Sequence, residues 1–176
     1  IRSGLVRDVV SENRFAFWLA PTKELVSQAV SAFQSLWARY GDGVAYVHDA
    51  RDGTSQRAVP HGAITFATYQ ASAAWNSSGR AAAYGRDCGF VVADEAHRAI
   101  APTYKEALEA LTHRSVRIGL TATPGRQAEL SVENVDVANF FDTNVVRATE
   151  SSDEVGDLQS QGVLSQLART VVQVRT

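Results

Sequence analysis

The sequence predicts an α/β domain with a doubly wound, mainly parallel sheet flanked by helices. Two observations support that prediction. Short apolar runs of strand length alternate along the chain with helical patterns, as in right-handed β-α-β units. Two of the runs are nearly continuous in apolar residues, which is typical of strands buried on both faces of a parallel sheet. The length of 176 residues suits one such domain with a core of its own.

The strand predictions follow from the apolar runs. Four of them are expected to be strands, at residues 15–20, 63–67, 89–93 and 116–120. Residues 44–48 favour another strand, and residues 144–149 favour a strand at the edge. The β-branched residues 170–174 predict a strand or the start of a linker.

The longest helix is expected directly after Pro21, where apolar residues recur at steps of three and four over about five turns. Thr22 is its predicted N-cap and Gly41 its predicted end. Shorter helices are expected at residues 3–12, 103–111, 135–141 and 153–161. Residues 53–62 and 76–87 are predicted to be loops, because Gly, Ser, Asn and charged residues dominate them.

Composition limits the classes of function. The net charge of −2 provides no global basic field, so a nucleic-acid contact would need a local surface. No apolar run approaches the roughly 20 residues of a membrane span, and no signal peptide is recognisable. The single cysteine, Cys88, excludes an internal disulfide and is expected to be a buried structural thiol. These features favour an intracellular, cytoplasmic protein. The chain lacks Met altogether, which suggests a fragment of a longer protein.

Polar or turn-rich segments follow all four of these predicted strands. They are Pro21–Leu25, Thr68–Gln70, Asp94–His97 and Thr121–Pro124. In open α/β sheets, ligands bind beyond the carboxyl ends of the strands. We therefore expect these four segments to lie along one edge of the sheet.

The pair Asp94-Glu95 is the strongest candidate for chemistry. Two adjacent carboxylates at the end of a buried strand are costly unless a cation or a donor accompanies them. A magnesium–nucleotide complex is a natural partner, with Asp94 holding the water shell of Mg²⁺ and Glu95 activating the attacking water. The alternative is that both carboxylates cap the following helix.

The other candidates each have a simpler alternative. His97 lacks a second zinc ligand at helical spacing, since the next histidine is His113. Thr121 and Thr123 could bridge the carboxylates to a neighbouring element, or could form an ordinary turn. Thr22 and Lys23 begin a helix whose amides suit a phosphate of a nucleic-acid backbone, or they serve only as a cap.

The four segments, in this order and spacing, resemble motifs of the superfamily 2 DEAD/DEAH-box helicases. Val91–His97 looks like motif II, the DEAH box, and Leu120–Arg126 like motif III. Ala20–Leu25 looks like motif Ia, and Ile64–Gln70 like the next nucleic-acid-contacting motif. His97–Tyr104 is typical of the branch that holds the ATPase subunits of type III restriction enzymes and DNA-repair translocases, and so are residues 140–164.

The resemblance implies a RecA-like fold of the P-loop NTPase class, with ATP and Mg²⁺ as ligands and DNA, or RNA, as partner. It implies that Asp94 binds Mg²⁺ through water and that Glu95 is the catalytic base. His97, Thr121 and Thr123 would couple hydrolysis to nucleic-acid binding. The residues near the nucleic-acid backbone would be Pro21, Thr22, Lys23, Thr68, Tyr69 and Gln70.

The resemblance also implies a domain plan. Residues 1–150 would be the first RecA-like ATPase domain, and residues 151–176 its end and a linker to a second RecA-like domain. No Gly-x-x-x-x-Gly-Lys-Ser/Thr occurs in the sequence, so the phosphate loop is expected upstream of Ile1. The chain alone is then expected to be inactive, and its full-length parent is expected to be an ATP hydrolase. Nuclease or methylase subunits are the partners that the resemblance implies. The alternative is a binding or scaffold module that retains the fold without catalysis.

Overall fold

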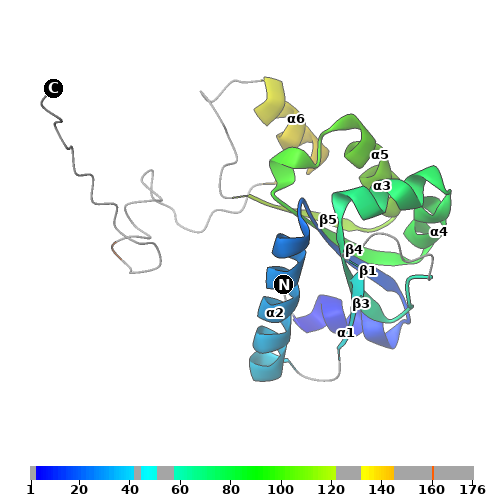
Figure 1. Cartoon of the computed structure of the whole chain (residues 1–176), viewed down its shortest axis with the longest axis vertical. Helices are drawn as coiled ribbons and strands as arrows, with labels where there is room; N and C mark the ends of the chain where they lie inside the picture. The colour runs from blue at the N-terminus through cyan, green and yellow to red at the C-terminus, as the bar shows by residue number, and fades with distance from the viewer. Residues whose placement is uncertain (1–2, 42–44, 51–57, 122–131, 145–159, 161–176) are drawn as a thin grey trace, which may run out of the picture. The chain divides into compact units, whose positions relative to one another are not determined.

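The computed structural model describes residues 3–41, 45–50, 58–121, 132–144 and 160. The chain divides into two compact units, Ile1–Thr143 and Asn144–Thr176, and the fold described below is that of the first. Its strands form one parallel sheet in the order β2-β3-β1-β4-β5 (Figure 1). The strands are β1 (Phe15–Ala20), β2 (Tyr46–Ala50), β3 (Ala63–Thr68), β4 (Cys88–Asp94) and β5 (Val116–Leu120).

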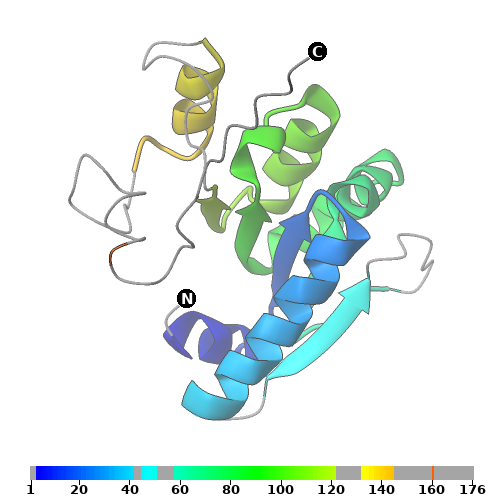
Figure 2. The same cartoon turned by 60° about the vertical axis from the view of Figure 1, so that its left-hand side comes forward.

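Helices cover both faces of this sheet (Figures 1 and 2). One face packs against α1 (Ser3–Ser11) and α2 (Lys23–Tyr40). The other packs against α3 (Tyr69–Ser77), α4 (Arg80–Arg86) and α5 (Pro102–Leu111). A short 3-10 helix, η1 (Ala96–Arg98), follows β4, and α6 (Val132–Phe140) contributes Phe140 to the same core as α3 to α5. No helix of the described residues is long and apolar enough to cross a membrane.

The central strands are buried on both faces, as their continuous apolar runs predict. In β1, Phe15, Phe17 and Leu19 face one core, and Ala16 and Ala20 face the other. Every residue of β3 is buried. The prediction of a doubly wound parallel sheet is therefore confirmed.

A bulge interrupts the pairing of β1 with β4. Phe15 pairs with Cys88, but the next residue, Ala16, pairs with Phe90. Gly89 is therefore an extra residue on β4, and a Cβ there would lie 2.8 Å from Val9 Cγ2 in α1. The bulge reverses the facing of the strand, so that Cys88 and Phe90 enter opposite cores.

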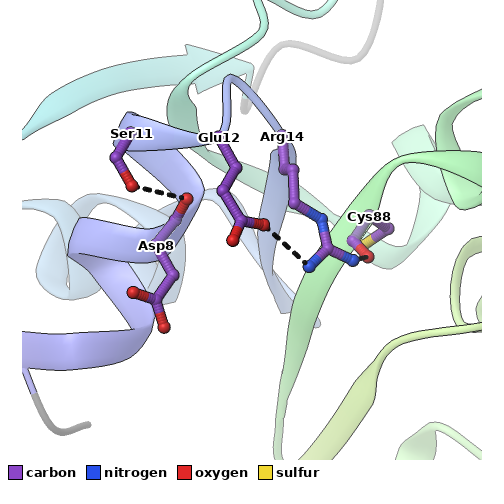
Figure 3. A network of polar contacts seen from close by, with 5 residues as sticks. All are labelled: Asp8, Ser11, Glu12, Arg14 and Cys88. Atoms are coloured by element: carbon purple, nitrogen blue, oxygen red, sulfur yellow. Dashed lines mark hydrogen bonds and ion pairs between the residues drawn. The ribbon is translucent and has the colours of Figure 1, made fainter.

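Arg14 joins the amino-terminal ends of β1 and β4 (Figure 3). Its Nη2 donates a hydrogen bond to the carbonyl of Cys88 at 2.5 Å, and its Nη1 lies 3.5 Å from Glu12 Oε2. Upstream, the Ser11 hydroxyl donates to the carbonyl of Asp8 at 3.4 Å. Cys88 is fully buried, and burial raises the pKa of its thiol to about 11. This agrees with the expected structural, unreactive thiol.

Most predicted elements are present within two residues of their expected ends. The loop prediction for residues 76–87 is wrong, because α3 continues to Ser77 and α4 occupies Arg80–Arg86. Gly and charged residues stand at the ends of that segment, while its centre is Ala-rich and helix-forming, and Tyr84 anchors it in the core. The predictions at residues 53–57, 145–149 and 170–174 lie outside the described residues, as does nearly all of 153–161.

The contact between α4 and α5 is testable at Gly85. A Cβ at this position would collide with the carbonyl oxygen of Ala110. Main chain cannot move aside as a flexible side chain can, so we expect Gly85→Ala to lower the free energy of unfolding by about 1–3 kcal/mol. Chemical denaturation measures this change. Ala82→Ser, at an exposed position of the same helix, should change stability by less than about 0.5 kcal/mol. Equal stability of both variants would contradict this packing.

Candidate functional site

The segments that follow four neighbouring strands meet at the carboxyl edge of the sheet. Ala20 of β1 pairs with Thr68 of β3, and Asp94 of β4 pairs with Leu120 of β5. Because all these strands are parallel, the turns after them lie side by side along that edge. The structure thus brings together the first residues of all four predicted segments. Thr123 and Pro124 of the fourth segment lie outside the described residues.

The turn after β4 has an unusual backbone. Glu95 adopts a left-handed conformation with φ of 52°, which costs a residue with a Cβ roughly 1–2 kcal/mol. Its main-chain N–H donates a hydrogen bond to Asp94 Oδ1 at 3.0 Å. Helix η1 then begins at Ala96, whose side chain is buried. Such a conformation persists only where the surroundings hold it, and it is found most often at functional sites.

Tyr69 provides part of that hold. Its hydroxyl donates a hydrogen bond of 2.7 Å to the carbonyl of Asp94, and its side chain is 0% exposed. Its ring stacks on Tyr104 of α5, with centroids 5.2 Å apart. The resemblance to helicases implies that Tyr69 lies near a nucleic-acid backbone, but in this conformation its side chain contacts the acidic turn from inside. Burial is the largest cause of a strongly raised pKa of this phenol, so the hydroxyl remains a donor.

The carboxyl group of Asp94 is partly desolvated. Burial raises its pKa above the ordinary value of 3.8, the Glu95 amide lowers it, and the nearby Glu95 carboxylate raises it again. The indole of Trp18 lowers the pKa least, because Trp18 Nε1 makes no hydrogen bond among the described residues. No lysine or arginine of the described residues offsets the charge.

His97 lies between the acidic turn and the end of β5. Its Nδ1 is 3.3 Å from Glu95 Oε2 and 3.5 Å from Thr121 Oγ1. Its Nε2 is buried and makes no hydrogen bond within the described part of the chain. His97 thus brings together two of the residues that the motifs predicted, Glu95 and Thr121.

The turns after β1 and β3 are both helix N-termini. The Thr22 hydroxyl accepts a hydrogen bond from Leu25 N at 3.3 Å and caps α2. The Thr68 hydroxyl accepts one from Ala71 N at 3.2 Å and caps α3. Capping, the simpler alternative for Thr22, is therefore confirmed. The side chains exposed at this part of the edge are Thr22, Lys23, Glu24 and Gln70, whereas Pro21 and Thr68 are buried.

The acidic turn suits a hydrated Mg²⁺ better than a caged metal. Among the described residues, no three His, Cys, Asp or Glu side chains converge as a metal site. Asp94 carries a negative charge that no described cationic side chain offsets. Mg²⁺ keeps several waters and takes one or two carboxylates plus phosphates of a nucleotide, which a single aspartate beside an open edge can satisfy.

Sequence reasoning located the acidic turn but missed the contact that supports it. The hydrogen bond from Tyr69 joins residues 25 positions apart. A tyrosine directly after a buried strand carries no signal that separates an inward from an outward side chain, so this role could not be read from the sequence.

The parallel sheet, flanked by helices and ending in this acidic turn, defines a RecA-like domain of the helicase type. A family model described as "Type III restriction enzyme, res subunit" matches residues 5–126, which is more than half of the chain. The chain therefore belongs to the family of type III restriction enzyme res subunits and is a first RecA-like domain of the superfamily 2 helicases.

Solved structures show the same fold. One of 22 matching chains is the "Crystal structure of Pyrococcus furiosus Hef helicase domain", with 24% sequence identity and a TM-score of 0.57. The match covers 85% of this chain but 32% of the other, so the chain spans about a third of that structure. A likeness at this identity shows the fold alone. No curated protein sequence matches.

The desolvated carboxylate leads to a stability prediction. The raised pKa of Asp94 means that its ionised form destabilises the folded state. This destabilisation is fully present at pH values above the folded pKa and absent at pH values below the ordinary 3.8. Asp94→Asn should therefore raise Tm at pH 7 in the absence of nucleotide, by about 2 °C. This gain should vanish as the pH falls below 3.8.

Thermal melts followed by circular dichroism across this pH range measure the effect. Asp87→Asn, at an exposed position before β4, removes the same charge and should leave Tm unchanged. A lower Tm for Asp94→Asn at pH 7 would show that the carboxylate is stabilised in the folded protein, contrary to the direction of its pKa.

Proposed function

We propose that this domain is part of a nucleic-acid-dependent ATPase motor of the DEAH type, a helicase or translocase that acts on DNA in preference to RNA. The observation that carries the proposal is the acidic turn, where a desolvated Asp94 and a left-handed Glu95 lie on the edge shared with three other motif segments. Membership of the res-subunit family supports an ATPase of the helicase kind.

In the proposed reaction, Asp94 binds Mg²⁺ through a water molecule. When bound, Mg²⁺ would offset the charge that develops on the phosphates of the nucleotide. Glu95 lies beyond the end of the strand, where its side chain is 37% exposed and its carboxylate can orient a water and accept its proton. The water oxygen attacks the γ-phosphorus as the bond to the β–γ bridging oxygen breaks, and ADP and phosphate leave.

The proposed link from hydrolysis to movement runs through His97. Its Nδ1 lies within 3.5 Å of both Glu95 Oε2 and Thr121 Oγ1. A change in the charge around Glu95 would alter which of the two partners the imidazole favours. Thr121, and with it Thr123, begins the segment after β5, so this choice can move that segment.

The proposed nucleic-acid contact lies at the turns after β1 and β3. Lys23 and Gln70 are exposed there, and the N-termini of α2 and α3 lie side by side because Ala20 pairs with Thr68. The N-terminus of α3 and the exposed Lys23 favour an anionic backbone, whereas Glu24 already places a carboxylate in the first turn of α2. In this proposal Pro21, Thr22 and Thr68 shape the turns, and Tyr69 acts from inside.

The phosphate loop must come from elsewhere in a longer protein for hydrolysis to occur. Within the described residues, β5 pairs on one side only, and Val116 and Leu120 on it are 51% and 39% exposed. We infer that a further strand carrying the loop pairs with β5. Residues 1–150 would be the first RecA-like domain, and residues 151–176 would be its end and a linker to a second RecA-like domain. The same proposal includes nuclease or methylase subunits as partners and a cytoplasmic location for the full-length protein.

The second candidate is a catalytically inactive binding or scaffold module. It is favoured by one observation, the lack of Gly-x-x-x-x-Gly-Lys-Ser/Thr in these 176 residues. The full-length sequence decides between the two candidates, because a phosphate loop encoded outside this segment supports the motor and its absence supports the scaffold.

Replacement of the proposed base tests the motor. In the full-length protein, Glu95→Gln should lower the DNA-stimulated ATPase kcat by several orders of magnitude, because it removes the group that accepts the proton of the water. Steady-state phosphate release measures this loss. Glu109→Gln, exposed on α5, is the matched control and should retain wild-type turnover. Unchanged turnover in Glu95→Gln would remove the proposed role.

Replacement of Lys23 tests the proposed DNA contact. Lys23→Ala should weaken binding about equally for all sequences and reduce the slope of log Kd against log salt by about 1. Fluorescence anisotropy with labelled single strands at several salt concentrations measures it. Arg39→Ala, in the last turn of the same helix, changes the net charge equally and should leave the slope unchanged. Equal salt slopes for the two variants would show that Lys23 makes no phosphate contact.

A further inference from the structure

The peptide group between Asp94 and Glu95 is held from both sides. Its carbonyl accepts the hydrogen bond of 2.7 Å from the Tyr69 hydroxyl. Its N–H donates to the Asp94 carboxylate at 3.0 Å. Both carboxylates of the acidic turn are attached to this one peptide group, so its orientation decides where each of them points.

Tyr69 reaches this peptide across an intervening strand. In the sheet order β2-β3-β1-β4, β3 and β4 are not neighbours, and no strand hydrogen bond joins them directly. Two strand spacings amount to about 9.5 Å. A side chain as long as tyrosine, placed directly after β3, extends past the end of β1 to the end of β4. Among the described residues, this is the hydrogen bond that joins the turn after β3 to the acidic turn.

The position of the hydroxyl follows that of the turn Thr68–Gln70. The Tyr69 ring is buried and stacked on Tyr104 at an interplanar angle of 19°. Its main chain starts α3, where Thr68 supplies the cap and the Ser72 hydroxyl donates to the Tyr69 carbonyl at 2.8 Å. A shift of the turn after β3 therefore carries the hydroxyl with it.

The left-handed Glu95 makes the peptide sensitive to that shift. Without its donor, the Asp94 carbonyl loses a buried partner, and rotation of the peptide would relieve the strain at Glu95. The same rotation would break the bond from Glu95 N to Asp94 Oδ1. One hydroxyl thus contributes to the placement of both carboxylates.

We propose that Tyr69 is a positioning residue that couples the turn Thr68–Gln70 to the Asp94–Glu95 peptide through its hydroxyl. The proposal rests on the proposed function, since it gives the nucleic-acid contact at that turn a route to the hydrolysis site. Tyr69 itself touches neither DNA nor nucleotide. Its effect is on the energetic coupling between the two ligands, which is reciprocal.

The test uses Tyr69→Phe in the full-length protein, which removes the hydroxyl and retains the ring. Affinity for a fluorescently labelled single-stranded DNA is measured by anisotropy, without nucleotide and with Mg²⁺ and a non-hydrolysable ATP analogue. The ratio of the two Kd values is the coupling factor, which for coupled sites is about 5–150-fold. We expect Tyr69→Phe to bring this ratio close to 1, while the Kd without nucleotide changes by less than about twofold.

Tyr84→Phe is the matched control. Tyr84 is also buried, at 7% exposure, and its hydroxyl accepts a hydrogen bond from Val59 N at 3.4 Å, away from the acidic turn. Both variants lose one buried hydroxyl, and each should unfold at a lower denaturant concentration than the wild-type protein. Only Tyr69→Phe should change the coupling ratio, which a purely structural role would leave unaltered.

A second variant keeps the test decisive if Tyr69→Phe folds poorly. Tyr104→Leu, at a half-buried position, removes the stacking ring and leaves the hydroxyl in place, and it should reduce the coupling ratio part of the way. A wild-type ratio in folded Tyr69→Phe, or in Tyr104→Leu where only that variant folds, would overturn the proposal. The proposed function fails separately, through wild-type turnover in Glu95→Gln.

Discussion

The candidate site depends on the peptide group that follows the last residue of β4. A buried parallel strand delivers two carboxylates to the carboxyl edge of the sheet, where a charge is partly desolvated and the backbone must turn. The turn is made in the left-handed region by Glu95, a residue type that avoids it. The strands on both sides and a tyrosine from across β1 hold it there. Backbone strain of this kind clusters at functional sites.

The parallel sheet explains why that support is available. Every strand of a parallel sheet ends on the same edge, so segments distant in sequence become neighbours without dedicated contacts. The pairings Ala20–Thr68 and Asp94–Leu120 are consequences of strand register alone. Side chains then add the longer connections, through His97 to the end of β5 and through Tyr69 to the end of β3. The family model identifies the same chain as a helicase-type domain of the res-subunit family.

The buried strands could be predicted because burial produces a recognisable pattern of apolar residues along the sequence. Apolar runs mark strands, three- and four-residue steps mark helices, and polar segments after the runs mark the functional edge. The prediction failed at residues 76–87, where Gly, Ser and charged residues at the ends concealed an Ala-rich helix anchored by Tyr84. Helix α4 exists because Tyr84 and Ala81 have a core to enter, which local composition does not reveal.

The sequence by itself determined the class of fold, the order in which the motifs follow one another along the chain, and the place of the acidic pair at the end of β4. It could do so because hydrophobic period and motif spacing are local properties. The tertiary structure alone decided that Tyr69 points inward to the Asp94 carbonyl and that Glu95 is left-handed. A side chain placed after a strand can face solvent or the interior. The choice depends on the length of its reach, the strand that lies between and the partner beyond it, none of which is encoded near Tyr69 in the chain.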